Sequence, residues 1–218
     1  MKNPVIYTSV YGAYDTIMPA PYDSKYRCVC ITENPDLVKD KGWEVIYREP
    51  TESSNVRNAK FAKINPHLFF PDNDVSLWMD TSLILVKDPE PVLTEWLQDS
   101  DMAMFDHLFP HVNNIVDELE ECKRSRKDNF EVMTNQVNRY MEEGFPYKNY
   151  NHFMGMFIAR RHHSENVIRL MNCWWDEIKN NSFRDQLSFS YSCWKTKFKC
   201  SRIEANSDEY FRNRPHGG

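Results

Sequence analysis

The stretch LWMDTSLIL, residues 77–85, places a single acid between two apolar runs. Leu77-Trp78-Met79 predicts a buried strand that stops at Asp80, and a second apolar run begins at Leu83. A carboxylate at the end of a buried strand is costly unless something pairs with it. Because open α/β sheets bind ligands outside the carboxyl ends of their strands, we expect Asp80 to face a ligand or a buried cation.

Outward from this stretch, strand-like and helix-like patterns alternate along the chain. β-branched and aromatic runs predict strands, and apolar residues at a spacing of three or four predict helices. The expected strands cover residues 5–10, 26–32, 43–47, 102–105 and 153–159, and the expected helices include 54–65, 112–122, 130–140, 167–178 and 183–194. This order predicts an α/β sandwich with a helix-rich second half. No internal repeat or linker divides the sequence, so we expect residues 1–218 to form one domain.

The composition limits the possible classes of function. A chain of 218 residues suits one domain, and its net charge of −5 argues against a nucleic-acid backbone as the main partner. No apolar run approaches the ~20 residues of a transmembrane helix. The first residues lead directly into a strand, so we expect no signal peptide and a cytoplasmic protein. The six cysteines lack paired spacing, which predicts reduced thiols and no cysteine zinc site.

The turn after the first strand is one candidate binding region. It carries hydroxyl and aromatic side chains that suit a nucleoside, which it could hold by stacking and hydrogen bonds. The residues are Thr8, Tyr11, Tyr14 and Asp15. The alternative is a polar turn whose only requirement is the backbone freedom of Gly12.

The helix expected over residues 54–65 carries cations near its apolar face. Arg57 falls on the same face as Phe61, Lys60 lies at the edge of that face, and Lys63 points further away. An inward arginine needs an anionic partner. A phosphate near the helix N-terminus and an ion pair with Asp80 are the two possibilities, and the sequence leaves both open.

Ser182-Phe-Arg-Asp185 opens the last long helix and has the S-x-x-D pattern of a capping box. That pattern favours Ser182 as N-cap and Asp185 as its reciprocal partner. The alternative is a carboxylate that contacts a bound substrate. Among the histidines, we expect the pair His162-His163 on the surface at the start of a helix, and His216 in a glycine-rich tail that could fold over a site.

Several motifs together resemble a known family. In order they are Y-G-x-Y-D at 11–15, N-x-R-N-A-K-x-x-K at 55–63, W-M-D-T-S at 78–82 and R-D-Q-L-S-F at 184–189. The sequence is similar, from about Val5 to Trp194, to the glycosyltransferase-like family formerly called a domain of unknown function. Its plant members include mucilage-related and turgor-regulation-defect proteins. The resemblance implies a GT-A fold, which is a Rossmann-like sandwich, a nucleotide-sugar donor and a glycan or glycoconjugate acceptor.

The resemblance also implies roles for individual residues. GT-A enzymes usually carry D-x-D after the fourth strand to hold Mn²⁺ or Mg²⁺, and the matching residues here are Asp80 and Ser82, so one acid is missing. His216 would be a late metal ligand, and Arg57 with Lys60 would add positive charge at the diphosphate. Asp185 and Gln186 would lie near the acceptor or the transferred sugar. Asp185 would be the base of an inverting enzyme or would stabilise the sugar cation in a retaining one.

Two rival functions remain. A non-catalytic nucleotide-sugar-binding domain would explain the serine in place of the second acid. A lipid amidase is the other rival, since ceramidase activity is associated with this family. It would need several histidine or acidic ligands around a metal-bound water, and the sequence has no H-E-x-x-H pattern to suggest them.

Overall fold

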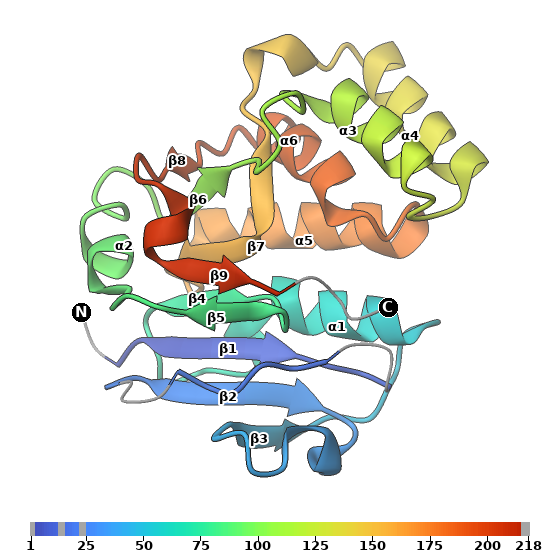
Figure 1. Cartoon of the computed structure of the whole chain (residues 1–218). Helices are drawn as coiled ribbons and strands as arrows, with labels where there is room; N and C mark the ends of the chain where they lie inside the picture. The colour runs from blue at the N-terminus through green and yellow to red at the C-terminus, as the bar shows by residue number, and fades with distance from the viewer. Residues whose placement is uncertain (1–2, 13–15, 22–24, 215–218) are drawn as a thin grey trace.

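A seven-stranded sheet forms the centre of the computed structural model, which describes residues 3–12, 16–21 and 25–214 (Figure 1). The strands in chain order are β1 (Val5–Ser9), β2 (Arg27–Thr32), β3 (Glu44–Tyr47), β4 (Ser76–Met79), β6 (Met102–Asp106), β7 (Phe153–Arg160) and β8 (Ser201–Arg202). Their order across the sheet is β3-β2-β1-β4-β7-β6-β8. All neighbouring pairs are parallel except those of β7, which runs antiparallel to both β4 and β6. The expected α/β class is confirmed.

Helices and a small second sheet complete the fold. The α-helices are α1 (Asn55–Ile64), α2 (Glu90–Thr94), α3 (Ile115–Arg124), α4 (Phe130–Glu142), α5 (Glu165–Asn180) and α6 (Asp185–Thr196). Short 3-10 helices are η1 (Pro35–Val38), η2 (Pro66–Leu68), η3 (Tyr147–Asn149) and η4 (Ser207–Glu209). β5 (Leu83–Leu85) pairs antiparallel with β9 (Phe211–Asn213), a pairing that the sequence patterns do not predict.

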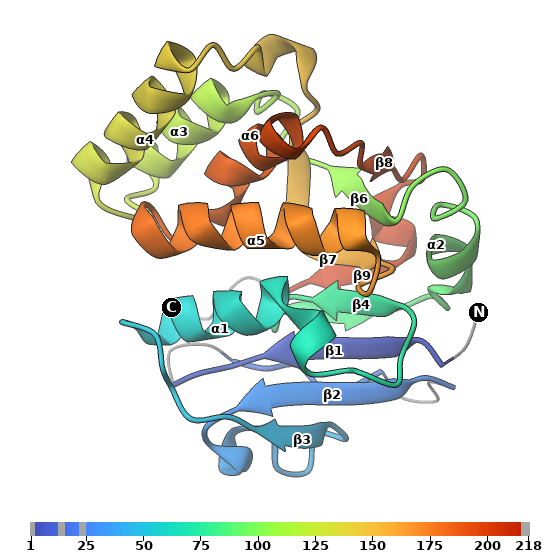
Figure 2. The same cartoon turned by 180° about the vertical axis from the view of Figure 1, so that it is seen from behind.

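Both faces of the large sheet are buried, because alternate residues of each central strand enter different cores. Val5 and Tyr7 of β1 pack in the core beneath α1 and α5, whereas Ile6 packs in the core beneath α2 and β9. The same alternation holds along β4, where Trp78 lies on the first face and Leu77 on the second. Figure 2 shows α1 and α5 side by side on one face of the sheet, and Figure 1 shows β5 and β9 on the other. Because β4 is buried on both of its faces, the run before Asp80 is continuously apolar.

The helix-rich second half builds a third core from α3, α4 and α6. Ile115 and Leu119 of α3 pack there with Tyr140 of α4 and Tyr191 of α6. The two tyrosine rings stack with their centroids 3.7 Å apart. In Figure 1 these three helices lie at the end of the molecule opposite β3. Of these helices, α6 also packs against β7.

Two local expectations have different outcomes. Ser54 caps α1 as predicted, because its Oγ accepts the backbone N–H of Arg57 at 3.2 Å. The expectation that His162 and His163 open a helix on the surface is wrong for the helix start and for His162, whereas His163 is exposed as expected. His162 is fully buried, α5 begins at Glu165, and each imidazole Nε2 lies 3.1 Å from the carbonyl oxygen of Phe70. Of the described helices, none has both the length and the apolar character needed to cross a membrane.

Candidate active site

Asp80 leaves the sheet at the carboxyl edge of its parallel strands. β1 and β4 run parallel with Tyr7 opposite Trp78, and Asp80 follows the last residue of β4. The indole Nε1–H of Trp78 donates to Asp80 Oδ1 at 2.7 Å, and the ammonium Nζ of Lys63 lies 3.5 Å from the same oxygen. The Asp80 side chain keeps 30% of its surface exposed. The acid between the two apolar runs is therefore held by a lysine and an indole, and one side of it faces solvent.

Lys63 connects Asp80 to a second carboxylate that is distant in the sequence. Its ammonium nitrogen lies 2.6 Å from Asp185 Oδ2, and the Lys63 side chain is 1% exposed. Lys60 Nζ lies 2.8 Å from the same Asp185 oxygen. Residues three apart on a helix share a face, so α1 presents both ammonium groups together. The prediction for Lys60 at the edge of the buried face agrees with this arrangement, whereas the prediction that Lys63 points away is wrong.

Asp185 is the first residue of α6, and its side chain is 3% exposed. Burial raises the pKa of its carboxyl group, but Lys60, Lys63 and Arg184 lower it by more, so the pKa lies well below its usual range. Burial lowers the pKa of Lys63, yet the two carboxylates beside it raise it overall. Both groups are therefore ionised at neutral pH.

The predicted capping box is wrong. The N-cap of α6 is Arg184, and no side chain caps this helix. Ser182 Oγ instead donates to Asp128 Oδ2 at 2.6 Å and accepts the backbone N–H of Arg184 at 3.1 Å. The helix begins two residues later than the pattern suggests, so the Asp185 side chain is free to bind the two lysines.

Gly155 in β7 has no side chain, and the head groups of Asp185 and Lys63 occupy the space beside it. A Cβ atom placed on Gly155 would lie 3.2 Å from both Asp185 Oδ2 and Lys63 Nζ, and 3.6 Å from Gln186 Cγ. Gln186, the other predicted catalytic residue, also donates weakly through Nε2 to the carbonyl of Phe153 at 3.5 Å. Sequence analysis did not single out Gly155. A glycine inside a strand often marks a close approach of another group, and that signal could have identified it.

Arg57 binds backbone carbonyl groups rather than a carboxylate. Its Nη2 donates to the carbonyl of Asn181 at 2.6 Å and its Nε to that of Ile178 at 3.3 Å. These carbonyls lie at the C-terminal end of α5, where a cation is favourable. The ion pair between Arg57 and Asp80 that the sequence left open is not formed. The reason is tertiary: α1 packs against α5, and its N-terminal turn meets the end of that helix.

The other predicted binding residues lie apart from the cluster. Thr8 is inside β1 and 1% exposed, and its hydroxyl has no hydrogen-bond partner among the described residues. Tyr11 is buried, with its hydroxyl 3.4 Å from Arg48 Nη1. Gly12 has a φ of 67° and packs against Asn55, as a required turn glycine would. Tyr14, Asp15 and His216 lie outside the described residues.

The surroundings of Asp80 fit a divalent cation poorly. Mg²⁺ and Mn²⁺ prefer several oxygen ligands, and Asp80 offers one carboxylate with the Lys63 ammonium already beside it. The second acid of the expected pair is Ser82, which is 4% exposed. The positive charge at this edge comes instead from α1.

Comparison with known proteins identifies the family. The family described as "TOD1/MUCI70, glycosyltransferase-like domain" matches residues 38–213. The "Probable hexosyltransferase MUCI70" of Arabidopsis thaliana is 28% identical over 214 residues, which cover 85% of this chain and 36% of that protein. The chain therefore spans about a third of the length of that relative.

A solved structure supports the fold. The galactosyltransferase LgtC, in complex with donor and acceptor sugar analogs, superposes with a TM-score of 0.51 over 92% of this chain and 73% of its own, at 11% identity. The likeness confirms the GT-A-type architecture that the motifs implied. On the match over residues 38–213, the chain belongs to the TOD1/MUCI70 family of glycosyltransferase-like domains.

Proposed function

We propose that this domain transfers a hexosyl group from a nucleotide-sugar donor to a hydroxyl of a glycan or glycoconjugate. The observation that carries the proposal is the cluster of Asp80, Lys63, Lys60 and Asp185, at the edge where α/β sheets bind ligands. Buried ionisable groups are costly to fold, and such clusters concentrate at functional sites. Asp80 and Lys60 are the more exposed members, with 30% and 18% of their side chains accessible, so they form the face that a donor reaches.

The charge state of Asp185 bears on its role. A general base works best when its pKa is near the working pH, and the pKa of Asp185 lies well below its usual range. Such a carboxylate accepts a proton poorly but stays negatively charged throughout the reaction. This supports a role in orienting sugar hydroxyls and stabilising positive charge on the transferred sugar, one of the two roles that the sequence left open. Lys60 is the ammonium group best placed to turn toward the donor diphosphate.

Donor hydrolysis and donor binding test the proposal. Purified domain would be incubated with a panel of uridine and guanosine diphosphate sugars, and free nucleotide and calorimetric affinity would be measured. We expect one donor to bind and to be turned over, with Asp185→Asn lowering turnover at least ~100-fold through loss of charge stabilisation, while binding persists. Asp176→Asn, at an exposed position on α5, is the matched control and should behave as wild type. A domain that binds no member of the panel would refute the proposal.

A non-catalytic binding domain predicts a different result in the same experiment. The serine at position 82, where GT-A enzymes usually carry an acid, is the observation that favours this second candidate. It predicts donor affinity equal to that of an active enzyme but no turnover by wild type with any acceptor supplied. Turnover that Asp185→Asn abolishes would exclude it.

The lipid amidase requires histidine and acidic side chains that converge on one point. The described residues contain one such group, His107, Glu118 and His152, made of different side chains from the Asp80 cluster. Hydrolysis of a ceramide by wild type that survives Asp185→Asn but not Glu118→Gln would favour this third candidate. Without ceramide hydrolysis it has no support.

A further inference from the structure

A second polar cluster lies where three chain segments meet at the helix-rich end of the molecule. His107 follows the last residue of β6, Glu118 lies on α3, and His152 directly precedes β7. One nitrogen from each imidazole and one oxygen from the carboxylate all lie within 4.8 Å of one another. The backbone N–H of His107 donates to the carbonyl of His152 at 3.0 Å, which fixes the two histidines side by side. No sequence motif links these three residues.

The distances within this cluster suit a cation better than direct hydrogen bonds. Nε2 of His107 and Nε2 of His152 each lie 3.4 Å from Glu118 Oε2. A charge-assisted hydrogen bond would shorten to about 2.7–2.9 Å. Ligands at about 2.1 Å from a tetrahedral zinc-like ion lie about 3.4 Å from one another. Both nitrogen–oxygen separations in this cluster match the spacing of ligands around a tetrahedral ion.

Two members of the cluster are almost fully buried. The side chains of Glu118 and His152 are 2% and 1% exposed, and His152 Nδ1 has no hydrogen-bond partner among the described residues. Glu118 Oε1 receives a 3.2 Å contact from the Cys122 thiol and a 3.5 Å contact from Arg184. The Arg184 contact is long, and a divalent cation would give this buried carboxylate a closer positive partner.

One contact opposes metal binding and must change. The backbone N–H of Phe109 donates to His107 Nδ1 at 3.2 Å. Coordination through His107 Nε2 places the ring proton on Nδ1, so this hydrogen bond must open. The Phe109 ring is 48% exposed and contacts the rings of His107 and His111, so opening this hydrogen bond also changes those contacts.

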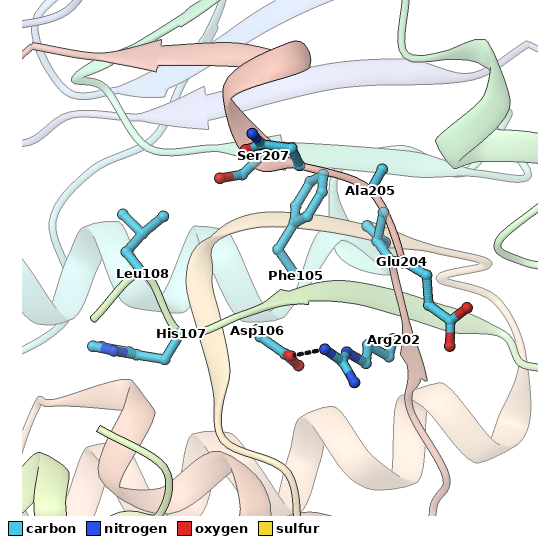
Figure 3. Close-up of a pocket in the computed structure, with 10 residues that line it drawn as sticks. Phe105, Asp106, His107, Leu108, Arg202, Glu204, Ala205 and Ser207 are labelled. Atoms are coloured by element: carbon cyan, nitrogen blue, oxygen red, sulfur yellow. Dashed lines mark ion pairs between the residues drawn. The ribbon is translucent and has the colours of Figure 1, made fainter. Parts of the chain in front are cut away.

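The cluster opens on a cavity of about 360 Å³. The residues that line it include His107, His152, Phe109, Lys148 and Tyr150. Figure 3 shows the His107 ring pointing away from the neighbouring ion pair of Asp106 with Arg202, so that acid does not belong to the cluster. Three protein ligands with a fourth position open to a cavity are the arrangement of a zinc site that binds water or a small ligand.

We propose that His107, Glu118 and His152 bind one divalent transition-metal ion of the zinc class, with its fourth coordination position facing this cavity. The site does not depend on the Asp80 cluster or on any transferase activity. It joins α3 to the ends of β6 and β7, and Arg184 links it to the start of α6.

Cobalt and zinc binding to chelator-treated protein test the site directly. We expect one equivalent of Co²⁺ with the intense visible absorption of tetrahedral coordination, displaced by Zn²⁺, and a higher melting temperature with Zn²⁺. His152→Ala and Glu118→Gln should each weaken metal binding at least ~100-fold. Loss of a residue that only hydrogen-bonds to a ligand would weaken it less. His111→Ala is the matched control, because His111 lies in the same turn but is 60% exposed, and it should bind as wild type.

Two further variants keep the outcome decisive. Cys122→Ser should retain the signal, whereas its loss would assign the metal to thiolates and overturn the proposal. If Glu118→Gln is unstable in chelator, the less buried His107→Asn serves in its place, since the His107 side chain is 10% exposed. Absence of stoichiometric Co²⁺ binding by folded wild type, or binding that survives loss of these ligands, would refute the site.

Discussion

Replacing Lys63 by methionine removes the ammonium group that joins the two acids of the candidate active site. Among the described residues, Asp185 would keep its ion pair with Lys60, and the Asp80 side chain would keep its hydrogen bond from the indole of Trp78. Breaking a buried ion pair by removing one partner costs about 3–5 kcal/mol, and Lys60 limits the cost here to about 3 kcal/mol. For a domain of this size, that corresponds to a melting temperature lower by about 6–12 °C.

Calorimetric melting of a double-mutant cycle isolates the ion pair. Lys63→Met, Asp185→Asn and the double variant would be compared with wild type at pH 7. Each single variant removes one of the two charged partners of a buried group. The double variant should therefore be less destabilised than the sum of the singles, by at least about 1 kcal/mol. Lys87→Met is the control, since the pair of Lys87 with Glu209 is half exposed and its loss should hardly change the melting temperature. Strict additivity would show that Lys63 and Asp185 do not interact, and the account of the site would then be wrong.

The remaining predictions concern pH and two other positions, Gly155 and Arg57. Because the pKa of Asp185 is lower in the folded chain, its stabilisation is complete above about pH 4, the unfolded value, and declines as pH falls below it; acid titrations of the melting temperature should therefore fall more steeply for wild type than for Asp185→Asn. Gly155→Ala should lower turnover by about tenfold or more, because the added methyl group displaces the head groups of Asp185 and Lys63. The free energy of unfolding should fall by only about 1 kcal/mol. Unchanged turnover would contradict this packing argument. Arg57→Ala should cost about 1.5–3 kcal/mol of stability by releasing the end of α5, with unchanged donor affinity in calorimetry; weaker donor binding would instead restore Arg57 as a phosphate ligand.

Much of the fold was accessible from local sequence patterns. The strand that ends at Met79, the cap at Ser54 and the helical stripe over 167–178 were all predicted, and the structure places each within a few residues. These features depend on residues close together in sequence: alternation fixes a strand, a spacing of three or four fixes a helix face, and a serine caps the turn beside it. The position of Asp80 at the carboxyl edge of the sheet was predicted in the same way, from the apolar run that precedes it.

Tertiary structure alone decided what the polar side chains do. The capping pattern at Ser182 was locally sound, but Asp128 from another segment binds that hydroxyl and the helix starts at Asp185 instead. Lys63 looked like a surface residue because its partner, Asp185, lies 122 positions along the chain. An ion pair depends on which segments the sheet order brings together, and periodicity carries no information about that order. The sequence therefore determined the strands, the helices and the edge that carries Asp80, whereas the partners of each charge, including the group of His107, Glu118 and His152, exist only once β7 lies between β4 and β6.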